Sequence, residues 1–591
     1  MRRLPGICAL GAFLMLALPA WTAPFRPDDT KAAPQDIKPI IPGANRYQEG
    51  KVFLEHADEW RYEEQPDVAP EDQYQVLVGS VVFRKNDMYM YCDSAHFYEQ
   101  SNSFDAFSNV RMEQGDTLFV YADELDYDGP TEVAVLYADP GKKVRLINRD
   151  VKLETDVFNY DMPAEVGYYN VGGVLSDAQN TLSSLEGEYH PNSKDAYFHF
   201  DVKLNSLNGS DTLRMFTDSL NYNTGTHIAE LVSPTRIINA DGEILSSSGT
   251  YNTETGLADL YKRSLVLTNR GNTLTGDTLF YDRNRGIGEA FGNMVLTDSA
   301  RSSSLHGSYG YYDDFADSAF VTGRALAKEY SRGDTLYLHG DTIFAYLDKT
   351  DSTRVMNVYH KVRFYRSDVQ GLCDSLSSTE RDSILYMFRH PVIWSGDRQI
   401  YGNVIHVHFN DSAPDWAKLP EFGFMAEHLD EDCYQQMSAT EMTTWFNDST
   451  IRHLFAEGNV MLIMFPMEKD STYNKFAYVE SSIMDAWFLD NDIERVLFTP
   501  ATTAKVTPLY LAKKGSYFLP KFEWYGDLRP TSPEDVFIVP QGMIDLIESA
   551  PPATIVKRTR PARKAGTAPD SEDTELASRQ GKEAVKEDEN P

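Results

Sequence analysis

Residues 290–296 read Ala-Phe-Gly-Asn-Met-Val-Leu, and two other segments of the chain repeat this pattern closely. Residues 106–112 read Ala-Phe-Ser-Asn-Val-Arg-Met, and residues 456–462 read Ala-Glu-Gly-Asn-Val-Met-Leu. The small residue followed by Asn suits a tight turn, because Gly and Asn tolerate a positive φ. Apolar and polar residues then alternate, which is typical of a half-buried β-strand. The pattern predicts a turn followed by a strand that has one face toward an apolar interior.

A second short motif, an Asp followed a few residues later by Tyr or Phe, falls between these turns. It occurs at Asp93, Asp123, Asp218 and Asp277, and degenerate copies fill the intervals so that successive copies lie about 31 residues apart. A unit of this size holds two or three short strands and cannot bury its own apolar face, so neighbouring units must stack. The sequence therefore predicts an elongated, all-β protein built from tandem repeats of about 31 residues.

The period-2 alternation also assigns candidate interior residues. In most of the units, the first and third residues after the turn are apolar, and we expect them to face the interior of the array. Large side chains at such positions fit two outcomes: a filled interior, which makes a rod, or sheets that part along one seam and leave an apolar groove. The candidate groove residues are Val81, Phe83, Val110, Met112, Leu118, Val120, Val202, Leu204, Leu265, Leu267, Met294, Leu296, Val362, Phe364, Val460 and Leu462.

Composition and charge exclude several classes of protein. The 591 residues include 55 basic and 89 acidic side chains, and the net charge is −34. This balance argues against a nucleic-acid partner, because clustered Lys and Arg hold a phosphate backbone. A content of 42% hydrophobic and 12% aromatic residues is too apolar for a chain that is disordered throughout.

Motifs for chemistry are scarce. His406 and His408 share one face of an expected strand, but no third ligand is adjacent, so we predict no metal site. The repeated Asp residues recur in register, whereas an active site needs one special constellation, so we assign them a structural role. Three widely spaced cysteines (Cys92, Cys373 and Cys433) do not form a disulfide framework. We predict no cofactor and no enzymatic activity.

The two ends of the chain differ from the repeats. Residues 1–23 begin with basic residues, continue with twelve largely apolar ones and end with small ones, which predicts a cleaved signal peptide and an exported protein. Such an apolar stretch is too short to span a bilayer, which needs about twenty residues. We expect helix in part of 430–446 and at 542–549. The predicted divisions after the signal peptide are a lead-in segment (24–75), two repeat regions (76–300 and 301–500, the second with degenerate repeats), a C-terminal capping segment (501–550) and a disordered tail (551–591).

The three quoted segments resemble the A-x-G-N-V-x-L signature of OstA-type repeats. Residues 120–127 and 274–281 resemble the other half of that repeat, L-x-x-D-x-L-x-Y, the first with Val in place of Leu. The resemblance covers roughly residues 75–465 and is strongest to the long OstA-like proteins of Bacteroidetes-type bacteria. This family includes LptA, the bridge protein of lipopolysaccharide transport, and the N-terminal domain of the outer-membrane translocon LptD.

The resemblance implies a β-jellyroll shaped like a taco, whose apolar groove carries the acyl chains of lipid A. It implies a non-enzymatic, periplasmic, lipopolysaccharide-binding transport protein that forms part of a groove or bridge toward the outer membrane. The implied partners are lipopolysaccharide, other Lpt-type jellyroll proteins joined by pairing of edge strands, and the outer-membrane translocon. The alternative is a structural or adhesive β-solenoid without lipid cargo; a carbohydrate-active enzyme is a more distant possibility.

Overall fold

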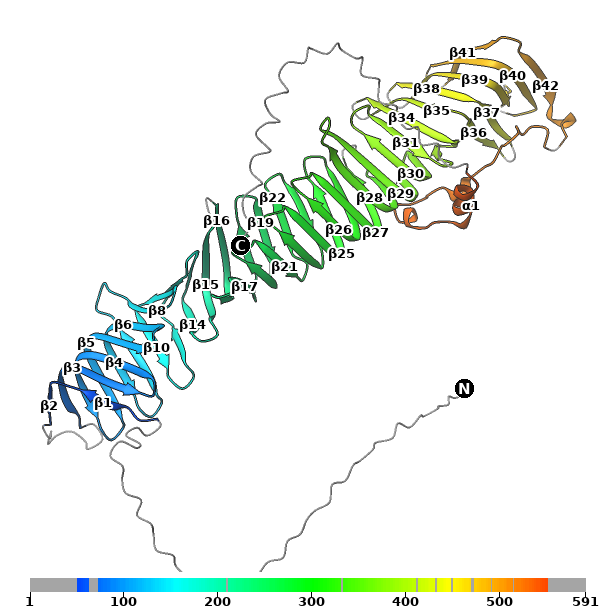
Figure 1. Cartoon of the computed structure of the whole chain (residues 1–591). Coiled ribbons are helices and arrows are strands. Elements are labelled where there is room, and N and C mark those ends of the chain that lie inside the picture. The colour runs from blue at the N-terminus through cyan, green and yellow to red at the C-terminus, as the bar shows by residue number, and fades with distance from the viewer. Residues whose placement is uncertain are drawn as a thin grey trace, which may run out of the picture.

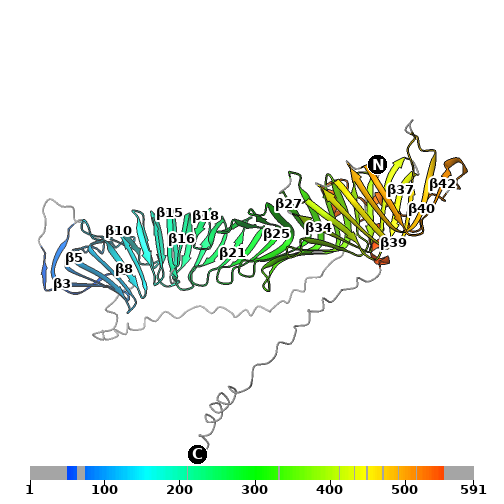
Figure 2. The ribbon, with the colours of Figure 1, turned by 90° about the horizontal axis from the view of Figure 1, so that it is seen from above.

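The computed structural model describes residues 50–62, 73–208, 211–330, 333–410, 413–430, 433–447, 450–468, 472–489, 492–513 and 515–550. The predicted signal peptide, the predicted tail and most of the lead-in segment lie outside the described residues. Within them, 42 strands form one continuous antiparallel sheet (Figure 1). The strands run across the long axis of an elongated body, as Figure 2 shows from above. The prediction of an elongated all-β fold is confirmed.

Long strands alternate with stretches of shorter ones. The first strands are β1 (Phe53–His56), β2 (Glu59–Arg61), β3 (Gln75–Lys85), β4 (Met88–Tyr98), β5 (Ser103–Gln114) and β6 (Leu118–Asp128). A stretch of mostly short strands follows: β7 (Val133–Tyr137), β8 (Val144–Asn148), β9 (Val151–Thr155), β10 (Val157–Asp161), β11 (Val166–Tyr169), β12 (Gly173–Ser176), β13 (Asn180–Ser184), β14 (Glu186–His190), β15 (Asp195–Asn208), β16 (Asp211–Asn223), β17 (Ile228–Leu231), β18 (Thr235–Ile238), β19 (Gly242–Ser246), β20 (Gly249–Asn252), β21 (Leu257–Tyr261), β22 (Leu265–Thr268), β23 (Asn272–Thr275) and β24 (Thr278–Asp282).

The second half of the array has the same construction. Its long strands are β25 (Ile287–Asp298), β26 (Ser303–Asp313), β27 (Ser318–Glu329), β28 (Leu336–Asp348), β29 (Thr353–Arg366) and β30 (Val369–Thr379). The last strands are β31 (Ile384–Phe388), β32 (Val392–Ser395), β33 (Arg398–Gly402), β34 (Val404–Asn410), β35 (Ala413–Leu419), β36 (Gly423–Asp430), β37 (Cys433–Ala439), β38 (Glu441–Asn447), β39 (Thr450–Met464), β40 (Lys475–Leu489), β41 (Asp492–Thr499) and β42 (Thr503–Pro508). The helical elements are η2 (Leu509–Leu511), η3 (Gly526–Leu528), η4 (Glu534–Phe537) and α1 (Gln541–Ser549).

In each of the three quoted segments, the Gly-Asn or Ser-Asn pair is a corner inside a long strand. In β5 the pairing with β6 is interrupted between Phe107 and Val110, where Ser108 and Asn109 have φ values of 63° and 53°. The two halves of a cornered strand then pair with different neighbours: in β6, residues 118–121 pair with β8 and residues 124–128 pair with β7. The sheet is therefore folded along the line of corners into two arms that face each other.

The repeated Asp residues hold these corners. Asn109 Nδ2 donates a hydrogen bond to Asp93 Oδ2 (2.6 Å), and Asn293 Nδ2 donates one to Asp277 Oδ2 (2.7 Å). The backbone N–H of Asp277 also donates to the carbonyl oxygen of Gly292 (2.8 Å). The Asp of one strand thus ties down the left-handed corner of the next strand, which is a structural role.

The helix predictions are half right. Residues 541–549 form α1, as expected for 542–549. The described part of 430–446 forms β37 and β38 instead, so the prediction of helix there is wrong. Met437 and Ala439, and then Met442 and Thr444, point alternately into the core on either side of a corner at Thr440, whose N–H donates to the carbonyl oxygen of Gly458 (2.7 Å). The apolar period there is two, not 3.6.

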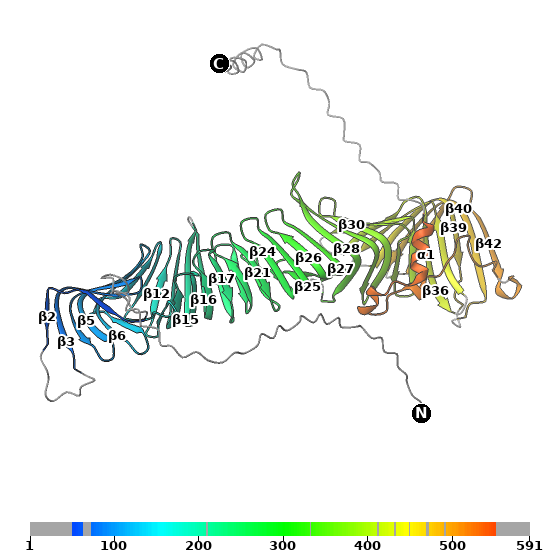
Figure 3. The same ribbon diagram turned by 60° about the horizontal axis from the view of Figure 1, so that its bottom comes forward.

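The described residues of 509–550, the greater part of the predicted capping segment, pack along the outer face of one arm, against strands that include β32, β33, β36, β39 and β40. Gln399 Nε2 donates to the carbonyl oxygen of Glu523 (2.9 Å), and Gln436 Nε2 donates to that of Tyr517 (2.9 Å). Leu519 and the α1 residues Met543 and Ile547 join a second apolar cluster on this face, and Figure 3 shows α1 lying against it. Among the described residues, no helix has the length and apolar character needed to cross a membrane.

Candidate functional site

A row of tyrosines fills the interior between the two arms from β6 to β26. Following the register from strand to strand, the inward position of one arm alternates between Tyr and a small residue, which leaves room for each ring. The tyrosine row and its small partners are Tyr127, Ala134, Tyr160, Gly167, Tyr189, Ala196, Tyr222, Ala229, Tyr251, Ala258, Tyr281, Gly288, Tyr312 and Ala319. The next position, on β28, is Ala345, where the alternation would require another Tyr.

The facing arm supplies an aliphatic row in the same way. Its members are Val120, Leu146, Leu153, Leu175, Leu182, Leu204, Met215, Ile237, Ile244, Val266, Leu274, Leu296, Leu305, Ala327 and Leu338. Most residues of both rows belong to one continuous buried core. Through the section with tyrosines, the protein's own side chains therefore fill the space between the arms.

Polar side chains of the aliphatic arm bind the tyrosine hydroxyls and join the two arms. Asn148 Nδ2 donates to the hydroxyl of Tyr189 (3.0 Å), Asn180 Nδ2 to that of Tyr222 (2.8 Å) and Asn272 Nδ2 to that of Tyr312 (2.9 Å). Lys85 Nζ binds the hydroxyl of Tyr127 in the same manner (2.7 Å). We call each of these bonds a clasp.

A cavity of about 350 Å³ opens where the tyrosine row stops. Its walls are apolar and include Leu296, Leu305, Ala319, Leu338 and Met356. Ala345 stands on β28 where a ring would otherwise fill the space, and it pairs with Ala319 of β27. Ala327, the one small member of the aliphatic row, lies on β27 opposite Ala319. The cavity thus lies where three alanines come together.

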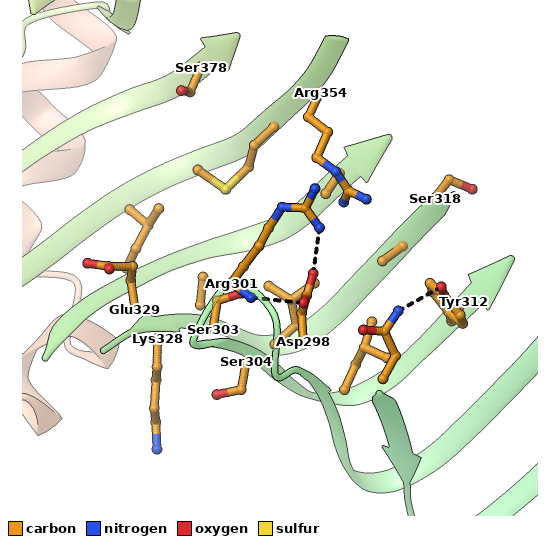
Figure 4. Close-up of a pocket in the computed structure, with 18 of the residues that line it drawn as sticks. Asp298, Arg301, Ser303, Ser304, Tyr312, Ser318, Lys328, Glu329, Arg354 and Ser378 are labelled. Carbon is orange, nitrogen blue, oxygen red and sulfur yellow. Dashed lines mark hydrogen bonds and ion pairs between the residues drawn. The ribbon is translucent and has the colours of Figure 1, made fainter. Parts of the chain in front are cut away.

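Charged residues surround this cavity, as Figure 4 shows. Arg301 forms an ion pair with Asp298 (2.9 Å), and Arg354 forms one with Asp317 (2.5 Å). Glu329 also lines the cavity, whereas the side chain of Lys328 points away from it (Figure 4), with Nζ 5.8 Å from the centroid of the Tyr337 ring. Because the two arginines are each paired with a carboxylate, the rim offers many hydrogen-bonding groups without a strong excess of either charge. An apolar chamber with such a rim suits an amphiphile, with its tail inside and its head at the rim.

Thirteen of the sixteen predicted groove residues are buried in the main core, and Leu462 packs against it. Of the sixteen, Leu296 is the one that lines the cavity. Leu118, Val120, Val202 and Leu204 lie in the filled section, and Val81, Phe83, Val110 and Met112 lie on β3 and β5, just before it. These residues are all far along the chain from Ala345. Met294, Val362, Phe364 and Val460 are also buried, but they are not part of the cavity wall.

The assignment of Leu265 and Leu267 to the interior is wrong. The corner in this unit falls at Lys262 and Arg263, with φ values of 57° and 60°, so the first inward residue is Ser264. Ser264 is buried, and its Oγ lies 2.7 Å from Ser246 Oγ. Val266 is the second inward residue, whereas Leu267 is 36% exposed. A one-residue error in the position of the corner moves every side chain of a strand to the opposite face.

The residues that shape the cavity were not predicted from the sequence. Tyr312, Ala319, Ala327 and Ala345 matter because of what stands opposite them in neighbouring strands. The signal that would have found them is the alternation of Tyr with Ala or Gly along the register and its interruption at Ala345.

The remaining candidates from the sequence have structural partners. His408 stacks on Trp416, with ring centroids 5.2 Å apart, and Nδ1 of His408 lies 3.2 Å from an oxygen of Asp415. Burial, followed by the charge of Lys418, lowers the pKa of His406. Across the described ranges, no group of three or more His, Cys, Asp or Glu side chains is arranged to hold a metal ion. Cys92 and Cys373 are free, buried thiols.

The cornered strands and the two facing arms define a jellyroll of the OstA type. A family model described as OstA-like protein matches residues 49–210 and 206–277. Residues 49–277 are therefore similar to the OstA-like family, a transport and binding family and not an enzymatic one. The match covers less than half of the chain and, of the residues that line the cavity, includes only Asn272. A comparison with curated proteins found no match.

Proposed function

We propose that this protein is a periplasmic carrier of lipopolysaccharide-type amphiphiles and that the cavity next to Ala345 receives their acyl chains. The observation that carries the proposal is an apolar chamber with a rim of paired charges, inside an array whose N-terminal part is OstA-like. Each methylene buried there contributes ~0.8 kcal/mol. A volume of about 350 Å³ lies near the lower end of the range for ligand pockets, so the cavity holds part of a lipid and not all of its chains.

The free strand edges at the C-terminal end of the array support a place in a bridge. In the described part of the chain, β41 and β42 each pair with β40 on one side only, so each has a free edge for a further strand. We propose that another jellyroll of the Lpt type pairs there and that the cargo then moves toward the outer-membrane translocon. The basic and apolar start of the sequence supports export to the periplasm.

A second candidate function is a scaffold without lipid cargo. The observation that favours it is the tyrosine row, because rings and clasps fill the interior from Tyr127 to Tyr312. In that section the rings leave no apolar chamber, and the space of about 290 Å³ beside Asn148 and Tyr189 has a mostly polar lining. A carrier requires the cavity to bind acyl chains, whereas a scaffold does not.

The decisive variant is Ala345→Tyr, which continues the tyrosine row by one position. If the ring displaces about three methylenes, the loss is ~2.4 kcal/mol, or about 60-fold in Kd. The measurement is displacement of a fluorescent lipid A analogue from the purified protein, with Ala345→Ser and Phe344→Tyr as controls. Phe344→Tyr adds one hydroxyl on the same strand, and both controls are expected to bind like the wild type. Equal binding by wild type and Ala345→Tyr, or no binding by the wild type, refutes the proposal and favours the scaffold.

A further inference from the structure

Tyr312 and Asn272 separate two cavities. Beside the cavity of about 350 Å³ lies a second one of about 30 Å³, and Asn272, Leu296 and Tyr312 line both. Leu296 is a member of the aliphatic row, whereas the Tyr312 ring and the Asn272 amide approach each other from opposite arms. The ring and its clasp are therefore the partition between the two spaces.

Several bonds hold this partition in place. The Tyr312 hydroxyl accepts a hydrogen bond from Asn272 Nδ2 (2.9 Å) and donates one to Asp314 Oδ1 (2.9 Å). Arg270 Nη1 lies 3.2 Å from the same Asp314 oxygen. Tyr312 is only 7% exposed, and burial together with the bond to Asp314 raises its pKa to about 12, so the hydroxyl stays protonated and keeps both bonds near neutral pH.

The space behind the partition is small because the next ring follows closely. Gly288 pairs with Tyr312 in the register, and Tyr281 pairs with Gly288 on its other side. A Cβ atom on Gly288 would lie 2.8 Å from Cδ2 of Leu274, so a larger residue would close the second cavity. Two strand spacings, ~9.6 Å, separate the rings of Tyr312 and Tyr281 along the axis of the array.

We propose that Tyr312 is the stop that sets the length of acyl chain the protein accepts. This inference rests on the function proposed above. A chain that enters over Ala345 and passes Ala319 meets the Tyr312 ring at the next position of the row. The chain can extend no further toward β24 while the clasp with Asn272 is closed. Tyr312 is in this sense a specificity-determining residue and not a general part of the core.

The test uses an alkylphosphocholine series of increasing chain length, below the critical micelle concentration, in competition with a fluorescent alkyl probe. In the wild type, affinity rises about fourfold per methylene until the chain end reaches Tyr312 and then stops rising. In Tyr312→Ala the rise continues for several further methylenes. Tyr311→Ala is the matched control, because it removes a neighbouring ring from the outer face of the same strand, and it keeps the wild-type limit.

Two results overturn the inference while leaving the proposed function intact: a wild-type protein whose affinity shows no length limit, and a Tyr312→Ala variant with the wild-type limit. Absence of binding at every length overturns both. If Tyr312→Ala does not fold, a second measurement on the wild-type protein tests the inference. The longest chain bound by the wild type, with a diazirine at its end, labels the peptide that contains Tyr312 and not β24, and labelling of β24 contradicts the stop.

Discussion

The clasp between Tyr222 and Asn180 allows a sharp test of what the tyrosine hydroxyls contribute to stability. The Tyr222 hydroxyl donates to Asp177 Oδ2 (2.6 Å) and accepts from Asn180 Nδ2 (2.8 Å). Asp177 has a fully buried side chain and also accepts from the backbone N–H groups of Gln179 (2.9 Å) and Asn180 (2.7 Å). Tyr251 is the next tyrosine of the row after Tyr222. Its hydroxyl is also buried, but no described group forms a hydrogen bond with it. The pair of variants Tyr222→Phe and Tyr251→Phe therefore makes one chemical change in two bonding environments.

The two variants are expected to change stability in opposite directions. A hydrogen bond to a charged group contributes ~1.5–3 kcal/mol, and Asp177 keeps its other donors, so Tyr222→Phe costs about 2 kcal/mol. Removal of a buried hydroxyl without a partner relieves its desolvation penalty, so Tyr251→Phe stabilises by ~1 kcal/mol. The expected difference between the two variants is about 3 kcal/mol.

The cost of Tyr222→Phe also depends on pH. Burial alone would raise the pKa of Asp177, but the hydrogen bonds from Tyr222, Gln179 and Asn180 bring it below its usual value. A carboxyl with a lowered pKa stabilises the fold above its unfolded pKa of ~3.9, and this contribution is lost as the pH falls through the folded pKa. Loss of the Tyr222 hydroxyl removes part of that contribution. The cost is therefore greatest near neutral pH and decreases at pH values below about 4.

The measurement is native-state hydrogen exchange of the amides in β13, β16 and β20, because stacked repeats pass stability mainly to their neighbours. Exchange at neutral pH and near pH 3, corrected for intrinsic rates, gives the opening free energy of each strand. Equal effects of the two variants, or a cost of Tyr222→Phe that does not change with pH, would refute the role assigned to the clasp.

Two further predictions concern the corners. Gly292→Ala places a Cβ atom 2.5 Å from Asp277 Oδ2 at φ +69°, whereas at Gly115, with φ +59°, nothing lies within 4 Å of the new atom. Gly292→Ala is therefore expected to lower the opening free energy of β25 by ~1 kcal/mol more than Gly115→Ala lowers that of its own hairpin. Equal losses measured by hydrogen exchange would contradict the role of Asp277 in holding the corner. Val266→Asp buries a charge in the core and is expected to cost several kcal/mol of stability, while Leu267→Asp costs less than about 1 kcal/mol because its side chain is exposed. Thermal unfolding of the two variants measures the difference. A larger loss of stability for Leu267→Asp would reverse the assignment of faces.

The corners show how far the sequence alone could predict the fold. Where a corner contains Gly or Ser followed by Asn, as at residues 108–109 and 292–293, the turn, the strand and the inward residues followed from the pattern. At Lys262 and Arg263 the backbone is the same, but neither side chain is typical of a left-handed conformation. At this corner the backbone N–H of Arg263 donates to the carbonyl oxygen of Asp277 (3.4 Å), a contact with the next unit of the array. The pattern predicted the inward residues one position too late. The prediction succeeded where the corner residues themselves favour a left-handed backbone. It failed where contacts with other strands impose that conformation.

The cavity could not be predicted for a different reason. Alanine at position 345 is an ordinary strand residue, and nothing within its own repeat marks it. Its effect arises because Ala319 lies beside it in the register and Ala327, on the facing arm, is also small, so that no ring and no long aliphatic side chain fills the section. The pairing of β26, β27 and β28 has to be known before the missing ring can be recognised. The OstA-like match ends at residue 277, so it covers most of the filled section and, of the residues that line the cavity, only Asn272. Resemblance to the family therefore indicates the kind of fold, whereas the cavity depends on where this chain departs from its own repeat.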